Sequence, residues 1–110
     1  MEGWTAQLRK GLVELAVLAA LRQSEQYGYE LLQHLRTAEG LIVTESTLYP
    51  LLARLRRERC VRVRAAPSPA GPPRRYYRLT AAGHDRLRAM ISQWHVIREQ
   101  IDHLLQESQS

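Results

Sequence analysis

The chain has 110 residues, of which 45% are hydrophobic and 25% are charged, and its formal net charge is +5. This length and composition predict one folded domain and argue against disorder. The single cysteine excludes an internal disulfide and a thiolate zinc site, and the lack of a long apolar run or signal-peptide core predicts a cytoplasmic protein with no membrane partner.

Two helices are expected in the first third of the chain. Residues 5–22 place leucines, valines and alanines on a wide helical face, which predicts a largely buried first helix. In residues 25–40, Tyr27, Leu31 and Leu35 recur every four positions, which predicts a second helix of about ten residues. Ser24 is its expected N-cap or linker residue and Gly40 its expected terminator.

The segment STLYPLLARLRRE, residues 46–58, combines a helical pattern of leucines with an internal proline. The leucines are spaced by three, one and three positions, which predicts one buried helical face. Thr44 or Ser46 is the expected N-cap, accepting a hydrogen bond from a free amide two or three residues further on. Pro50 then lies within about the first turn and a half of the helix, where at most one intrahelical amide is lost.

Residues 61–79 are predicted to form a β-hairpin. Val61 and Val63 alternate with arginines, as in a half-exposed strand. Residues 66–73 contain four prolines and a glycine, which predicts a loop, and residues 74–79 form the second expected strand. We expect one of Tyr76 and Tyr77 to pack on the core.

Thr80 is expected to cap a final helix of some 25 residues. Six apolar residues recur at spacings of three and four, as in a coiled-coil seam: Leu87, Met90, Trp94, Ile97, Ile101 and Leu104. A helix of this length reaches beyond a domain this small, so part of the seam is expected to need a second chain. The sequence therefore predicts a homodimer interface, with Trp94 either packing in it or forming a platform for an aromatic ligand.

This order of elements predicts a fold that is mainly α with a small β-hairpin: a winged helix-turn-helix with a long C-terminal helix, dimeric. Residues 1–79 would form the winged helix-turn-helix domain, with the wing at about 61–79. Residues 80–110 would form the C-terminal dimerisation helix.

The positive charge is concentrated in the third helix and the hairpin. Residues 44–79 hold nine arginines and only two acidic residues, whereas the remainder of the chain is slightly acidic. A helix fits the DNA major groove and a basic hairpin reaches backbone or minor groove, so this charge predicts a double-stranded DNA partner. The expected contacts are Ser46, Thr47, Tyr49, Pro50, Arg54 and Arg57 in the helix, and Arg74 and Arg75 in the wing. A solvated arginine-rich face is the alternative.

Three motifs closely resemble the PadR family of bacterial transcriptional regulators: YGYELLQHL (27–35), STLYPLLARL (46–55) and GPPRRYYRLTAAG (71–83). The leucine-rich first helix and the long helix with Trp94 fit the same pattern. The resemblance implies a homodimer that represses nearby genes by binding an inverted-repeat operator. It also implies release by a small molecule, with flat aromatic compounds bound between subunits near Trp94.

The chain departs from this family after the third helix. Where the family usually has glycine and then an aliphatic residue, this chain has Arg59 and Cys60. Arginine in the left-handed turn that ends a helix costs about 1 kcal/mol. We expect Cys60 to occupy the buried aliphatic position, with a redox role as the alternative.

Other kinds of site find little support. His95, Glu99 and His103 share one helical face, but a polar outer face explains them, so we expect neither a metal nor a cofactor. The sequence has no glycine-rich phosphate loop and no nucleophile with a paired base, so we expect no enzyme. Two alternatives remain: a winged-helix protein-interaction module, and a dimer that sequesters a ligand without specific DNA binding.

Overall fold

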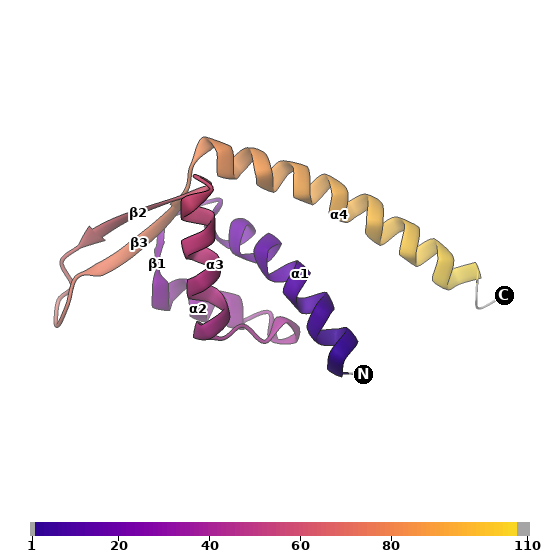
Figure 1. The fold of residues 1–110 in the computed structure, drawn as a ribbon, viewed down its shortest axis with the longest axis horizontal. Coiled ribbons are helices and arrows are strands. Elements are labelled where there is room, and N and C mark those ends of the chain that lie inside the picture. Colours follow the sequence, from indigo (N-terminus) through magenta and orange to yellow (C-terminus); the bar gives the residue numbers. More distant parts are fainter. Residues whose placement is uncertain (1, 108–110) are drawn as a thin grey trace.

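The computed structural model describes residues 2–107. Met1 and residues 108–110, the outer ends of the two segments expected at 1–79 and 80–110, lie outside the described residues. The elements follow in the order α1 (Glu2–Leu21), β1 (Gln26–Tyr27), α2 (Gly28–Arg36), a 3₁₀ turn (Glu39–Leu41), α3 (Glu45–Arg57), β2 (Val61–Ala66), β3 (Arg74–Leu79) and α4 (Ala81–Glu107). The fold is mainly α with a small sheet, as predicted (Figure 1).

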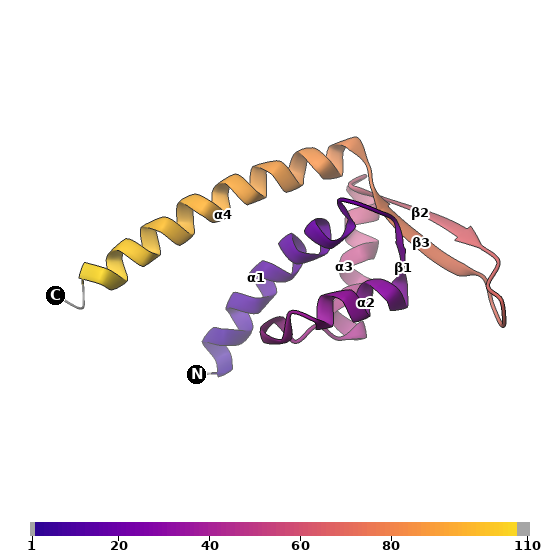
Figure 2. The same cartoon turned by 180° about the vertical axis from the view of Figure 1, so that it is seen from behind.

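The core lies between α1, α2, α3, the inner face of the sheet and the first turns of α4. Leucines and valines supply most of it, and the most deeply buried are Val17, Leu18, Leu31, Leu32, Leu48, Leu52 and Leu55. The prediction of a largely buried first helix is wrong for its N-terminal half, where Trp4 and Leu8 are exposed. That half passes the 3₁₀ turn (Figure 2), where Arg9 Nε donates to the Gly40 carbonyl at 3.0 Å, but Trp4 and Leu8 stay exposed.

The second helix begins later than predicted. Gln26 and Tyr27 form the short strand β1, which pairs antiparallel with β3, and Tyr27 rather than Ser24 precedes the helix. The Tyr27 amide donates to Glu30 Oε1 at 3.3 Å. Gln26 is buried, and its Nε2 donates to the Ala20 carbonyl at 2.7 Å. The helix ends at Arg36 with Thr37 as C-cap, so Gly40 does not terminate it.

The strands form one antiparallel sheet in the order β1-β3-β2. The predicted hairpin is confirmed, with Val61 opposite Leu79 and Ala66 opposite Arg74. Val61, Tyr77 and Leu79 face the core, so Tyr77 is the tyrosine that packs inward. Because β1 covers its free edge, β3 is the central strand rather than an edge strand.

Thr44 is the N-cap of α3, which confirms one of the two predicted alternatives. The predicted side-chain cap is wrong: Thr44 Oγ1 contacts Ser46 Oγ at 3.0 Å and Thr47 Oγ1 at 3.1 Å instead of accepting from an amide. The Thr44 carbonyl accepts the amides of Thr47 and Leu48. Pro50 is the sixth residue of α3, so its missing amide costs one hydrogen bond in the second turn.

The end of α3, the base of the wing and the start of α4 pack closely against one another. Arg59 has a left-handed φ of 62°, and the buried Cys60 follows it, as the sequence led us to expect. Thr80 Oγ1 accepts the Gly83 amide at 3.0 Å and donates to the Arg59 carbonyl at 2.6 Å, which confirms Thr80 as the cap of α4. A Cβ on Gly83 would overlap the Cys60 carbonyl oxygen, so glycine is required for this approach.

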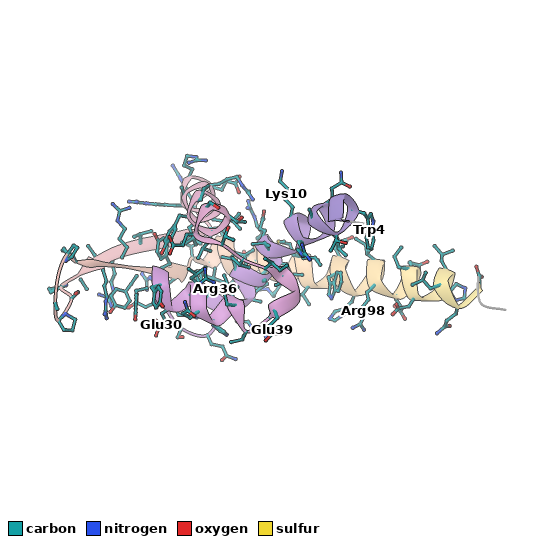
Figure 3. All side chains as sticks on the ribbon, turned by 90° about the horizontal axis from the view of Figure 1, so that it is seen from below. Trp4, Lys10, Glu30, Arg36, Glu39 and Arg98 are labelled. Atoms are coloured by element: carbon teal, nitrogen blue, oxygen red, sulfur yellow. The ribbon has the colours of Figure 1, made fainter. Side chains whose placement is uncertain are left out.

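The far end of α4 runs clear of the other elements. Figure 3 shows its last turns extending beyond α1, past the labelled Arg98. Within residues 2–107, no helix is long and apolar enough to cross a membrane.

Candidate nucleic-acid interface

A groove of about 550 Å³ separates the outer side of α3 from the inner face of the wing. Its walls combine cationic, aromatic and aliphatic side chains: Tyr49, Leu52, Ala53, Arg56 and Arg57 from α3, and Val63, Arg75 and Tyr77 from the sheet. Arg56, Arg57 and Arg75 are exposed, and none of their side chains has a hydrogen-bonding or ion-pair partner among residues 2–107. Their positive charge is therefore uncompensated within the described chain and available to an anion.

Tyr49 connects the two helices of the helix-turn-helix. A Cβ at Gly28 would lie 2.9 Å from the Tyr49 ring, so the absence of a side chain at the start of α2 allows this close packing. Partial burial, together with the nearby Glu45 carboxylate, raises the pKa of the Tyr49 hydroxyl above its usual value. The hydroxyl therefore stays protonated near neutral pH and keeps a hydrogen to donate.

The N-terminal turns of α3 present further polar groups. Ser46 and Thr47 are exposed and share hydrogen bonds with Thr44, and Pro50 is exposed one turn later. The N-terminus of a helix carries partial positive charge, which favours a negatively charged partner. Ser46, Pro50 and Arg57 are spaced by four and seven positions, so they share one side of α3, and Thr47 lies at its edge.

Arg54 does not line this groove. Its guanidinium pairs with Glu14 of α1 and donates to Glu58 Oε1 at 3.1 Å. Arg86 of α4 also pairs with Glu58, at 2.5 Å. The two arginines hold the pKa of the Glu58 carboxyl below its usual value. The arginine that sequence reasoning placed on the DNA side is thus engaged inside the protein.

The two wing arginines of the prediction lie on opposite faces of β3. Arg75 lines the groove beside Tyr49, whereas Arg74 stacks over the Tyr27 ring at 4.3 Å on the other face. On that other face Arg64 pairs with Glu25 and lies 4.6 Å from the Tyr76 ring. The same guanidinium lowers the pKa of the Glu25 carboxyl.

Sequence reasoning missed Arg56 as a groove residue. Tyr49, Ala53 and Arg56 are spaced by four and three, so they share one edge of α3. This spacing from Tyr49, itself a predicted contact, would have indicated Arg56.

The six seam residues divide along α4. Leu87 is buried in the chain's own core, and Met90 and Trp94 are half-buried. Ile97, Ile101 and Leu104 are 54%, 49% and 58% exposed.

Among the residues that the structure describes, no group of three or more His, Cys, Asp or Glu could hold a metal ion. His103 instead lies 3.1 Å from Glu107 of the next turn.

Comparison with known protein families gives one match. Residues 17–89 match the transcriptional regulator PadR-like family. This stretch contains α2, α3, both wing strands and the start of α4, so it includes every residue of the groove.

Solved structures of similar fold include other proteins of this family. A PadR-like transcriptional regulator from Bacillus cereus is 34% identical with a TM-score of 0.81, over 91% of this chain and 97% of that one. A PadR family regulator from Eggerthella lenta is 33% identical with a TM-score of 0.83, over 94% and 90%. Bacillus subtilis PadR, solved in complex with operator DNA, has the same fold at 24% identity, with a TM-score of 0.64 over 73% and 46%.

Proposed function

The chain belongs to the PadR-like family of transcriptional regulators, and from this premise we propose that it is a cytoplasmic homodimeric repressor that binds an inverted-repeat DNA operator. The observation that carries the proposal is the groove in which α3 and the wing bring together three arginines without partners in the described chain. Phosphate oxygens are the chemical complement of such a surface.

We assign each part of this surface a role. Ser46, Thr47, Tyr49 and Pro50 would enter the major groove on the N-terminal half of α3, with Arg56 and Arg57 on phosphate or guanine. Arg75 would hold the flanking backbone from the wing, with Arg74 nearer the loop on the opposite face. Arg54 is left out of this set because its guanidinium is occupied by Glu14 and Glu58.

The exposed apolar residues of α4 support a homodimer. Ile97, Ile101 and Leu104 continue the seam beyond the protomer's own core, and burying them against a second copy would remove a row of aliphatic side chains from water. Two α3 helices would then enter successive major grooves about one helical turn apart. Leu87 is already buried in the protomer's own core, so we assign the dimer contacts to the part of α4 that follows it.

We further propose that a small aromatic effector binds near Trp94 and releases the DNA. Such a ligand shifts the equilibrium only if it binds better to a dimer spacing that misfits the operator. With Trp4 replaced by phenylalanine, fluorescence reports on Trp94 alone, because the chain has two tryptophans. Quenching by an aromatic compound without any change in DNA affinity would favour ligand sequestration over regulation.

The DNA-binding proposal is tested by selecting duplexes from a random pool with the full chain, and by footprinting DNA upstream of its own gene. We expect an enriched inverted repeat. Arg57→Ala and Arg75→Ala should each weaken binding to that duplex about tenfold and lower the salt slope by about one, because each removes a phosphate contact.

Arg88→Ala is the matched control, since it removes the same charge from α4, where Arg88 pairs with Asp85. It should leave affinity nearly unchanged. Failure to enrich any sequence, or equal losses in Arg88→Ala and Arg57→Ala, would overturn the assignment and favour a protein-interaction module.

A further inference from the structure

Four charged side chains, Glu14, Arg54, Glu58 and Arg86, form a cluster that we name the ionic joint. Resting on the proposed function, we propose that the ionic joint fixes the orientation of α3 against α1 and α4. Arg54 then acts on DNA binding as a positioning residue, through its carboxylate partners, and does not touch DNA.

The ionic joint connects three helices through alternating charges. Arg54 Nη2 pairs with Glu14, and Arg54 Nη1 lies 3.1 and 3.2 Å from the two oxygens of Glu58. Arg86 Nη1 lies 2.5 Å from Glu58 Oε1 and 3.6 Å from Glu14 Oε2. Each carboxylate therefore faces both guanidinium groups, and the four charges cancel.

This arrangement holds Arg54 in place. The Glu14 and Arg54 side chains are 22% and 40% exposed, so the pair is partly withdrawn from water. Moving Arg54 to a DNA phosphate would exchange two carboxylate partners for one phosphate and leave Glu14 and Glu58 with Arg86 alone. Both kinds of bond are charge-assisted, so the exchange would lose one such partner and leave two carboxylates to share one guanidinium, which is unfavourable.

The position of the ionic joint gives it a role in DNA recognition. The C-terminal end of α3 lies beside the start of α4 (Figures 1 and 2), and Glu58 and Arg86 tie these ends together. Thr80 adds two hydrogen bonds across this junction, from its hydroxyl to the Arg59 carbonyl and from its amide to the Cys60 carbonyl. Since α4 carries the exposed seam, the direction in which each dimer half presents α3 depends on this junction.

The sharpest test replaces an acidic residue. Long-range attraction and positioning by the ionic joint then predict opposite changes in DNA affinity. Glu14→Gln makes the protein more positive, so long-range attraction alone would strengthen DNA binding. The ionic joint predicts instead that binding to the selected duplex weakens about two- to fivefold, a scale set by the range measured for single ion pairs. Binding to a scrambled duplex should stay equal or rise, and the salt slope should not fall.

Glu25→Gln is the matched control. It removes the same charge and also breaks an ion pair with an arginine, but Glu25 and Arg64 lie on the wing face away from the groove. This variant should bind the selected duplex at least as well as wild type. If Glu14→Gln behaves like Glu25→Gln, the ionic joint has no positioning role.

A charge exchange provides the second test and a control for folding. Arg54→Glu alone should weaken selective binding more than tenfold, and adding Glu14→Arg should bring affinity back to within about threefold of wild type, because the pair re-forms with reversed polarity. If Arg54 touches DNA, the double variant stays as weak as Arg54→Glu, even when its circular dichroism and melting are normal. Wild-type protein that selects no duplex would instead contradict the proposed function itself.

Discussion

The two halves of α4 carry the same apolar pattern but meet different surroundings. In the first half Gly83 and Leu87 are buried, and Met90 and Ile91 pack against the core. In the second half Ile97 and Ile101 are about half exposed, and the helix runs clear of the rest of the molecule (Figure 3). One heptad pattern therefore has two environments: its first part packs on the protomer's core, and its second part leaves aliphatic side chains exposed.

This division gives each half a different thermodynamic signature. Changes in the first half should alter the stability of the protomer itself. If the proposed dimer forms through the second half, changes there should chiefly alter association, because Ile97, Ile101 and Leu104 are about half exposed in the protomer. Three substitutions separate these effects.

Gly83→Ala should have the largest effect. The new methyl group would overlap the Cys60 carbonyl oxygen and lie 3.1 Å from its carbonyl carbon. That carbonyl accepts the Thr80 amide at 3.0 Å, so it cannot move without loss of a hydrogen bond. We expect the free energy of unfolding to fall by about 3 kcal/mol or more, measured by urea denaturation.

Gly11→Ala is the control for this substitution. Gly11 is exposed in the middle of α1, and a Cβ there meets nothing within 4 Å. Alanine should stabilise the protein by up to about 1 kcal/mol, because it has the higher helix propensity. Equal effects of the two substitutions would show that α4 does not depend on close contact at Gly83.

Ile101→Glu should have the next largest effect, and on association alone. Burying a charge in the seam of a dimer should raise the dimer dissociation constant about 30-fold, equivalent to about 2 kcal/mol, with little change in helix content. Analytical ultracentrifugation over a range of concentrations measures this shift. Ser92→Glu adds the same charge to an exposed position on the other side of α4 and should leave the dimer intact. A monomeric wild type would contradict the proposed interface.

The sequence was sufficient to predict the elements whose pattern is local. Leucine spacing located α3, valine–arginine alternation located β2, and Thr80 marked the start of α4. The strand β1 was missed because two residues have no periodicity, and its pairing with β3, Gln26 opposite Tyr77 and Tyr27 opposite Tyr76, is what defines it. In the same way, the heptad pattern of α4 does not predict that Leu87 is buried and Ile101 exposed. The two residues differ only because the core of the protomer lies against Leu87.

The candidate interface was predictable in composition but not in detail. The excess of arginine in residues 44–79 indicated a basic surface, and Arg57 and Arg75 do line the groove. Arg54 was assigned to the same surface because helical spacing reports direction only within α3. Its partner Glu14 is 40 residues away, and no local pattern predicts that α1 brings a carboxylate to it.

Arg59→Gly should have the smallest effect. It tests the residue whose carbonyl accepts the Thr80 hydroxyl and so connects the end of α3 to the start of α4. Arg59 has a φ of 62°, a region in which a side chain is unfavourable and glycine is not. Glycine should therefore raise the free energy of unfolding by about 1 kcal/mol, measured at one fixed protein concentration so that the proposed dimer would contribute equally to each variant. Arg59→Ala keeps the Cβ, so it should give little of this gain. If alanine stabilises as much as glycine, the cost at this position comes from the arginine side chain among its basic neighbours, and not from the left-handed backbone.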